Sequence, residues 1–327
     1  MTCARPAIFA RPIAAFAGLL LSAAPAAALT ITPYFDASIT TSGNAASVES
    51  AINQAISTVD SLYSNTGTVG IVFSQSSSVL GQSETVDYSI GYSGYVAALT
   101  ADATAHPSNT ILATALAHLS AGNDANGAGA IDATSAFFRA ALGFNATGCF
   151  NSAGAFVNTC GQSYDGVITL GTGLNYGTTP VANTYSAIAT AEHEIDEILG
   201  GGGQGSTLGQ SIAAFGPLDL YRYSAAATPS FTTSGSATAY FSVDGGTTSI
   251  VSFNQTAPGD YADFGASGDV QSAYGTPGTV PSYTTASPEF AMMSAIGYDA
   301  VAVPEPGSLA VFALAALAMP RTRRRRR

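Results

Sequence analysis

The sequence contains no lysine, no tryptophan and few charged residues of either sign. Asp, Glu, Lys and Arg together make up 9% of the 327 residues. The ten basic residues are all arginines, and only Arg139 and Arg222 lie between residues 29 and 303. Twenty acidic residues occupy that stretch, so its formal charge is −18, against −11 for the whole chain. A surface this poor in cations argues against nucleic-acid binding, which needs Lys and Arg for phosphate contacts.

The first 28 residues have the pattern of a secretory signal peptide. Arg5 and Arg11 precede an apolar run from Ile13 to Leu21, and Ala26-Ala27-Ala28 provides an A-x-A cleavage pattern. Signal peptides of this kind are removed from the mature protein, so we expect cleavage after Ala28. A buried N-terminal helix is the alternative interpretation.

The other end of the chain also has the pattern of a targeting segment. Val303-Pro304-Glu305-Pro306 leads into an apolar run from Leu309 to Met319, and then come Arg321 and Arg323 to Arg327. The run is short for a hydrocarbon core of about 30 Å, and its arginines favour the cytoplasmic side. The arrangement resembles the PEP-CTERM sorting signal of exopolysaccharide-producing Gram-negative bacteria.

This resemblance implies that residues 304–327 are a sorting signal recognised by an exosortase-type membrane protease. It further implies transient anchoring in the inner membrane and a final location at the cell envelope, on the surface or outside the cell. An exopolysaccharide matrix is a further partner that it suggests. Polysaccharide binding by the chain itself ranks behind other functions, because the chain has no tryptophan for stacking on sugars.

Two cysteines, Cys149 and Cys160, remain after removal of the signal peptide. They lie in a loop rich in Gly, Asn, Ser and Ala. In an oxidising compartment they favour a disulfide, which contributes about 2–4 kcal/mol. A two-cysteine metal site is the alternative, but nearby histidines and the C-x-x-C spacing are both missing.

Residues 29–303 suffice for one large domain or two closely packed ones. Apolar residues at helical spacing predict helices, and short β-rich runs predict strands. The expected helices cover residues 47–63, 94–105, 113–119, 185–199 and 290–296, and the expected strands cover 69–74 and 166–170. Beyond residue 203, short runs between Gly, Asn, Asp and Pro clusters predict hairpins and loops. The fold class is therefore α+β, with an α/β part to about residue 203 and a loop-rich and β-rich part over 204–303.

The most informative stretch runs from Thr190 to Gly200 and holds four carboxylates and one of only three histidines. At about 100° per residue, His193, Glu194 and Glu197 share one arc of a helix, and apolar residues occupy the opposite arc. The glycines that begin at Gly200 then end the helix. This clustering indicates a metal site. An acidic helix face exposed to solvent is the alternative.

The spacing also carries a family resemblance. His193-Glu194-x-x-Glu197-x-x-Gly200 is similar to the first part of the metzincin signature, which has histidine at the places of His193 and Glu197. Gly203 stands at the place of the third metzincin histidine. A long helix, a strand and a later His-Glu helix also resemble the zincin metallopeptidases.

Residues 217–223 and 240–246 resemble exported bacterial proteins with PEP-CTERM tails that are classed among candidate metalloproteases. These resemblances imply a zincin-like domain over residues 29–303 with a mixed sheet and an active-site helix. They also imply a zinc cofactor and a peptide or protein substrate.

The expected chemistry follows from the helix. His193 and Glu197 are one turn apart, so both can reach one ion, and Glu194 would serve as general base toward a metal-activated water. Zinc is the expected metal. Because a ligand set with one histidine is harder than that of most zinc sites, Mn²⁺ or another divalent ion is an alternative.

The remaining roles are less strongly specified by the sequence. Asp219 is the first choice for the third ligand, and Asp196 is expected to orient the second nitrogen of His193 or a loop amide. Tyr221, with Tyr223 beside it, is the candidate for contacting the metal or the oxyanion. Structural roles are expected for His106, His118, Met292 and Met293.

Calcium is a further candidate cofactor of so acidic a protein. Four aspartates of the C-terminal part are candidates for a calcium site, although ordinary turn positions are the better interpretation of them: Asp244, Asp260, Asp263 and Asp269.

Two functions are consistent with these patterns. The first is an exported metal-dependent peptidase. The second is a non-catalytic cell-surface or matrix protein with a degenerate zincin fold.

Overall fold

The computed structural model describes residues 29–119, 129–210, 214–265 and 268–301. The expected signal peptide and sorting signal lie outside these residues. Within them the chain has an α+β fold, which confirms the predicted class. No helix of this part of the chain is both long enough and apolar enough to cross a bilayer.

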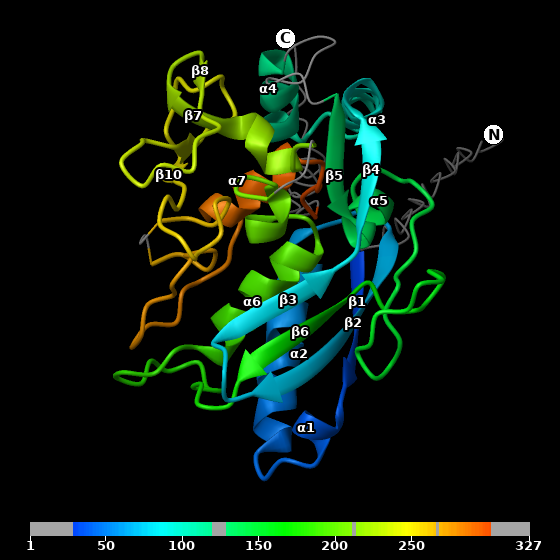
Figure 1. Cartoon of the computed structure of the whole chain (residues 1–327), viewed down its shortest axis with the longest axis vertical. Helices are drawn as coiled ribbons and strands as arrows, with labels where there is room; N and C mark the ends of the chain where they lie inside the picture. The colour runs from blue at the N-terminus through cyan, green and yellow to red at the C-terminus, as the bar shows by residue number, and fades with distance from the viewer. Residues whose placement is uncertain (1–28, 120–128, 211–213, 266–267, 302–327) are drawn as a thin grey trace, which may run out of the picture.

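The principal sheet has four strands in the order β1-β2-β6-β3 and is mixed (Figure 1). Its first three strands are parallel, and β3 pairs antiparallel with β6 at the edge. Their bounds are β1 (Leu29–Phe35), β2 (Gly67–Ser76), β3 (Gly81–Thr85) and β6 (Gly166–Gly171). The run from Val69 to Phe73 is buried throughout, as expected for a parallel strand covered on both faces.

Two long helices pack on one face of this sheet. Helix α2 (Ala45–Leu62) buries a stripe that includes Val48, Ile52 and Val59, and it packs against α6 (Ala187–Ile198). Helix α6 in turn packs against β6 and β3. The candidate metal-binding helix is therefore held between a long helix and the edge strand.

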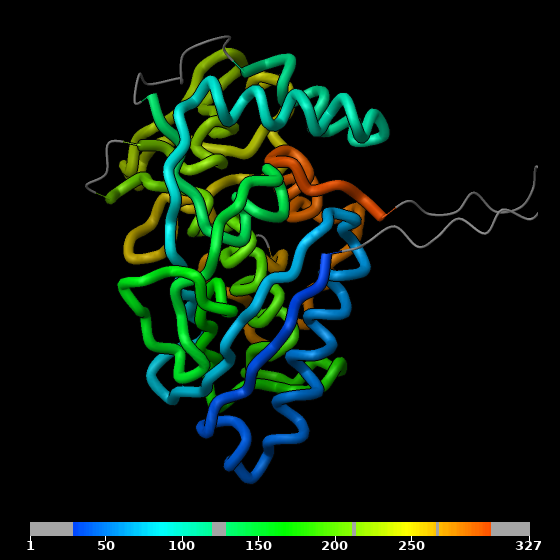
Figure 2. Tube along the Cα trace, turned by 90° about the vertical axis from the view of Figure 1, so that its right-hand side faces the viewer, coloured from blue at the N-terminus to red at the C-terminus, as the bar shows by residue number. Residues whose placement is uncertain are grey.

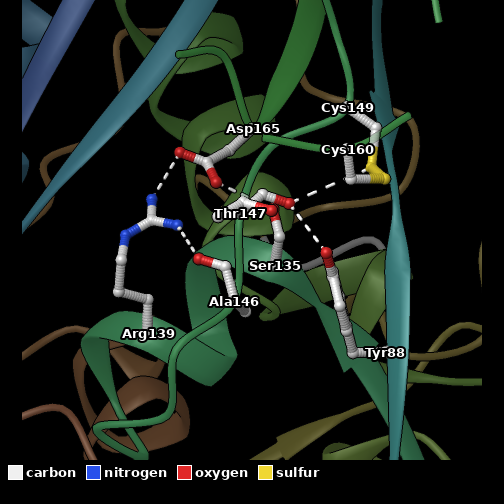
Figure 3. Close-up of a disulfide and its surroundings, with 8 residues drawn as sticks. All are labelled: Tyr88, Ser135, Arg139, Ala146, Thr147, Cys149, Cys160 and Asp165. Carbon is white, nitrogen blue, oxygen red and sulfur yellow. Dashed lines mark hydrogen bonds and ion pairs between the residues drawn. A yellow bond between two sulfur atoms is a disulfide. The ribbon is translucent and has the colours of Figure 1, made fainter. Parts of the chain in front are cut away.

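The opposite face of the sheet is covered by the loop that precedes β6. Val72 and Val167, which alternate with strand residues facing the helices, form a separate apolar cluster with Phe150 of this loop. The Cys149 and Cys160 sulfurs in the same loop lie at disulfide distance, as the sequence predicts (Figure 3). The stapled loop is thus a covering layer of the sheet.

The base of this loop is fixed by polar contacts (Figure 3). Arg139 donates to the carbonyl oxygen of Ala146 at 2.8 Å and to the carboxylate of Asp165 at 2.5 Å. Ser135 donates to the other oxygen of Asp165 at 2.8 Å. A buried carboxylate needs such donors, and Asp165 is almost fully buried.

Most of the other elements lie toward one end of this sheet, in the upper half of Figure 1. The smaller elements of the N-terminal part are α1 (Ala37–Thr40), β4 (Asp87–Gly91), α3 (Tyr92–Ala105), α4 (Thr110–His118), β5 (Ala130–Thr134) and α5 (Ser135–Ala140). Beyond α6 come η1 (Gly202–Gly205), η2 (Pro217–Tyr221), β7 (Arg222–Ala225), β8 (Thr228–Pro229), β9 (Tyr240–Phe241), β10 (Val251–Ser252) and α7 (Pro288–Ala295). Strands β7 to β10 form a small antiparallel sheet of short strands, and the long connections around them agree with the predicted loop-rich part.

The two ends of the described chain meet the same region of the fold. Leu29 pairs with Gly67 at the start of the sheet, and Ala300 forms a bridge with Tyr63 just before it. Val301 also donates its N–H to the carbonyl oxygen of Leu62 at 2.9 Å. Figure 2 shows both ends on the same side of the molecule.

Candidate metal centre

Helix α6 is bounded by two local signals. At its start, Ser186 accepts a hydrogen bond from the N–H of Ala189 at 3.2 Å and so caps the helix. At its end, Gly200 has φ +86°, a conformation that favours glycine. The N–H groups of Gly200 and Gly201 then bond to the carbonyls of Glu197 and Asp196, which ends the helix as the sequence predicts.

The four carboxylates of α6 are all buried. Glu192, Glu194, Asp196 and Glu197 are each at most 5% exposed. An acidic face exposed to solvent is therefore not what the helix presents. Glu194 and Glu197 line a pocket together with His193, whereas Glu192 and Asp196 are not among the residues that line it.

Three ligand-type atoms come together beside the helix. His193 Nε2 lies 3.7 Å from Glu197 Oε1 and 3.6 Å from Asp263 Oδ2, and the three atoms are within 4.8 Å of one another. One imidazole nitrogen and two carboxylate oxygens form a donor set that suits a first-row divalent ion. The sequence predicted two of these residues, His193 and Glu197, and assigned the third, Asp263, to a turn.

Each member of this group is oriented by a further contact. His193 donates its Nδ1–H to the carbonyl oxygen of Val270 at 3.0 Å, which directs Nε2 toward the two carboxylates. Ser83 donates to Glu197 Oε2 at 2.6 Å, and Gln271 Nε2 donates to Asp263 Oδ1 at 3.0 Å. These partners leave one oxygen of Asp263 directed at the group, so the residues present fit a metal ion.

Gly203, at the place of the third metzincin histidine, supports the site through its backbone. Its N–H donates to Glu197 Oε1 at 3.1 Å. A Cβ at this position would come within 2.7 Å of Asp260 Cβ and would also crowd the carboxylate of Glu197. The glycine run after α6 is therefore part of the wall of the site as well as a helix terminator.

The acidic surroundings favour a positive charge at this point. Burial lowers the pKa of His193, but the carboxylates of Asp263, Glu194 and Glu197 outweigh it and raise the pKa to about 10. Burial raises the pKa of Asp263 to about 7, although the charge of His193 opposes this rise. Without a metal ion, the protonated imidazole supplies the positive charge that the carboxylates require.

Glu194 is the fourth acid of the pocket. Burial raises its pKa well above the ordinary value, and the neighbouring Glu197 raises it further. It packs against β3, where the space beside the Gly81 backbone is filled by its carboxylate. A carboxyl of this kind can hold a proton and exchange it inside the pocket.

The pocket has a volume of about 370 Å³. Strand β3, helix α6 and parts of the chain within residues 260–263 and 269–281 all contribute to its walls. Besides the polar group, its lining includes the side chains of Leu80, Tyr185, Val270, Ala273 and Pro281. A cavity with a few convergent polar groups and apolar walls is the usual form of a small binding site.

Asp219 does not belong to this group, which corrects its expected role as third ligand. Its side chain accepts hydrogen bonds from Ser206 Oγ at 2.5 Å and from the N–H groups of Thr207 and Gly216 at 3.0 Å each. These donors use both carboxylate oxygens and fix the start of η2. Asp219 is therefore a buried structural carboxylate.

Tyr221 and Asp196 also occupy positions other than those expected. The Tyr221 hydroxyl donates to the carbonyl oxygen of Ala295 at 3.0 Å and is not among the residues that line the pocket. Asp196 accepts from Tyr283 at 3.1 Å, whereas Val270 takes the expected place of Asp196 at His193 Nδ1. Neither side chain orients or contacts the three ligand atoms.

The remaining expectations are met in part. Met292 and Met293 are fully buried in the core, as predicted. Asp244 lies in a turn, where it accepts from Ser242 at 2.7 Å and from the N–H of Thr248 at 2.8 Å. His118 is exposed at the end of α4, but His106 contacts two carboxylates, which the sequence did not indicate.

Comparison with known proteins adds no assignment. No known family, curated protein or solved structure matches this chain.

Proposed function

We propose that this chain is a metal-dependent peptidase with a zincin-like fold, in which His193, Glu197 and Asp263 hold one divalent ion. Zinc is the first candidate, with Mn²⁺ as the alternative. The observation that carries the proposal is the meeting of three ligand atoms within 4.8 Å in a pocket that contains a further acid, Glu194. If three of these side chains bind the ion and Glu194 acts as the base, each of the four has a reason to lie in the same pocket.

A divalent ion bound here would lower the pKa of a water molecule at the site and would polarise the carbonyl group of a substrate. The charge of a bound ion would lower the pKa of Glu194, which burial and Glu197 raise, so that Glu194 would accept the proton of the attacking water and pass it to the leaving amine. Val270 keeps His193 in the tautomer whose Nε2 is free to bind the ion. Ser83 and the backbone of Gly203 hold Glu197 in place.

A peptide is the substrate class that the edge of the sheet favours. Residues 81–83 of β3, with Leu80 just before them, line the pocket that contains Glu194. Strand β3 is the last strand in the order of its sheet and pairs with β6 on one side. An extended peptide can add to such an edge through main-chain hydrogen bonds, which brings a peptide bond alongside the candidate base.

Metal content and peptidase activity together test the proposal. We expect the zinc content measured by mass spectrometry to fall by about one ion per chain in His193→Ala and in Asp263→Asn. Glu194→Gln should retain the ion and lose cleavage of a casein substrate by at least about 100-fold, because the loss of a general base costs this much. Asp244→Asn, an acid in an exposed turn, is the matched control and should change neither quantity.

The second candidate is a non-catalytic surface or matrix protein with a degenerate zincin fold. One observation favours it: both oxygens of Glu197 already accept hydrogen bonds, from Ser83 and Gly203. This candidate predicts that the purified protein holds no ion at His193 and that Glu194→Gln changes no activity. Metal retained without any peptidase activity would likewise favour a binding role over catalysis.

The proposed location follows from the termini. The pattern of residues 1–28 supports export, and that of residues 303–327 supports recognition by an exosortase-type protease and a final place at the Gram-negative envelope or outside the cell. A protein substrate or an exopolysaccharide matrix there would be the partner of the exported domain. Calcium is a second ion to test in the same metal analysis, since the mature stretch is strongly acidic.

A further inference from the structure

A second group of ligand-type side chains lies outside the pocket. Asp102, His106 and Asp299 each bring one nitrogen or oxygen atom within 4.8 Å of the others. Asp102 lies in the last turn of α3, and His106 follows directly at the end of that helix. Asp299 comes from the segment after α7, which is tied to the end of α2 by a hydrogen bond from Ser64 N–H to its carbonyl oxygen at 2.8 Å.

Both carboxylates approach the same ring nitrogen. His106 Nδ1 lies 2.8 Å from Asp102 Oδ1 and 2.6 Å from Asp299 Oδ2. A ring nitrogen carries one proton at most, and among the described residues only the contact with Asp102 has hydrogen-bond geometry. The three atoms are therefore arranged around one point, with one donor proton for two acceptors.

The carboxylate of Asp299 forms an ion pair with His106 but lacks hydrogen-bond donors at one oxygen. Its side chain is 6% exposed, and its Oδ2 accepts no hydrogen bond from any described residue. Asp102 Oδ2 is likewise buried without a hydrogen-bond partner in this part of the chain. Buried carboxylate oxygens without donors are costly, and a cation at this point would satisfy them.

A neighbouring side chain holds Asp299 in this orientation. Asn109 Nδ2 donates to Asp299 Oδ1 at 3.1 Å, and its amide oxygen caps α4 by accepting from Leu112 N–H at 3.0 Å. The same amide nitrogen contacts the carbonyl oxygen of Tyr298 at 3.2 Å. Because Asn109 occupies Oδ1, the other oxygen of Asp299 is the one directed at His106, and side chains that hold metal ligands in place commonly act in this way.

We infer that Asp102, His106 and Asp299 form a second divalent-metal site, separate from the pocket, and that Zn²⁺ is the ion that fits it. Imidazole nitrogen and carboxylate oxygen both bind Zn²⁺, and ligand atoms bound at about 2.0 Å lie about 3.3 Å apart in a tetrahedral site. The observed separations of 2.6 and 2.8 Å need only a small opening to admit the ion. The His106 side chain is 51% exposed, so water can complete the coordination.

The site would fasten the turn between α3 and α4 to the last described residues of the chain (Figure 2). The ion would therefore stabilise the fold and take no part in the chemistry of the pocket. Without it, a proton shared by the three side chains is the competing occupant, since burial raises the pKa of both Asp102 and Asp299.

The test is a titration of the metal-free protein with Zn²⁺, followed by calorimetry and thermal unfolding. In the His193→Ala background, which removes the pocket site, we expect about one ion per chain and a rise in Tm on addition of zinc. Adding His106→Ala should abolish both. His118→Ala in the same background is the matched control, because His118 also lies exposed at a helix end and bonds only to its own helix at Thr114.

Asp299→Asn provides a second variant that keeps the size of the side chain, should His106→Ala fold poorly. It is expected to lower the zinc affinity by at least about tenfold. Zinc binding and a Tm shift that persist unchanged in both variants, or that never occur in the His193→Ala background, would overturn the inference. Wild-type protein that loses its only ion through His106→Ala would instead support this site and contradict the pocket site.

Discussion

His193 donates its Nδ1–H to the carbonyl oxygen of Val270, a residue 77 positions further along the chain. The contact joins the candidate metal-binding helix to the loop that also supplies Asp263 and Gln271. The orientation of the imidazole therefore depends on a loop residue, Val270, that is far from the helix in the sequence. Metal binding can therefore be tested by replacing residues other than the three ligands.

Replacement of Gln271 should weaken metal binding without removing a ligand. Gln271 is fully buried and donates to Asp263 Oδ1, so Gln271→Ala leaves that carboxylate free to rotate. We expect a loss of about 10–100-fold in affinity, measured by competition with a chelator. Gln54→Ala, on the exposed side of α2, is the control. Equal affinities in both variants would show that Gln271 does not position Asp263 for the ion.

A methyl group at Gly203 should disrupt the site more than one at an open glycine. In Gly203→Ala the new Cβ meets Asp260 and the carboxylate of Glu197. We expect a destabilisation of about 1–3 kcal/mol together with loss of bound metal. Gly173→Ala, where nothing lies within 4 Å of the added Cβ, should be close to neutral. The comparison is made by urea unfolding and metal analysis of both variants, and similar values would contradict it.

Removal of the disulfide should reduce stability without altering the metal content. Cys149 and Cys160 are separated by 11 positions, and a loop of this size contributes about 2–3 kcal/mol. The double variant Cys149→Ser and Cys160→Ser should unfold at lower urea concentration than the parent. A reductant should destabilise the parent and leave the variant unchanged. A reductant effect in the variant would point to another cause.

The pH dependence of stability should change at Asp60. Burial raises the pKa of this carboxyl from 3.8 to about 6, against the hydrogen bond from the N–H of Ile31. The folded protein thus binds the proton more tightly than the unfolded chain, and stability falls as the pH rises from about 4 to 6. In Asp60→Asn, the side-chain oxygen can still accept the hydrogen bond from the N–H of Ile31. The variant does not titrate, so it should not lose stability as the pH rises. Since the side chain is only half-buried, we expect a relative gain of about 1 kcal/mol at pH 7.

Asp244 should affect the pH dependence of stability in the opposite direction to Asp60. Hydrogen bonds, the largest from Thr248, lower its pKa to about 2, so its contribution is present above pH 4 and is lost in acid. Asp244→Asn should therefore lower stability at pH 7 relative to pH 2. Urea unfolding at several pH values checks both variants. Parallel curves for the wild type and Asp60→Asn would contradict the assignment of the raised pKa.

Local sequence signals predicted the elements that carry long periodic patterns. The helix predicted over residues 185–199 occurs as Ala187–Ile198, and the one predicted over 47–63 occurs as Ala45–Leu62. Strand β3 was not predicted, because Gly81-Gln82-Ser83-Glu84-Thr85 has neither apolar alternation nor β-branched enrichment. It forms because β6 offers it an edge, which is a property of the fold and not of these five residues.

The same distinction applies to the site. His193 and Glu197 are one turn apart on one helix, so their proximity follows from helical geometry. Asp263 reaches them only because the C-terminal loop folds back over α6, and no local pattern separates it from Asp244 or Asp269. Asp219 was predicted to be the third ligand, but its carboxylate instead accepts hydrogen bonds that fix the turn at Gly216. The tertiary arrangement of loops is the information that the sequence pattern lacked.

The pairing of Ala300 with Tyr63, beside the point where Leu29 enters the sheet, has a consequence for the order of assembly. The backbone at the end of α2 cannot form these contacts until the last described residues are present. A chain that is synthesised from its N-terminus therefore completes this core late. Contacts so distant in sequence slow folding and leave apolar surface uncovered meanwhile. The end of α2 would lack this backbone pairing until residue 300 has left the ribosome.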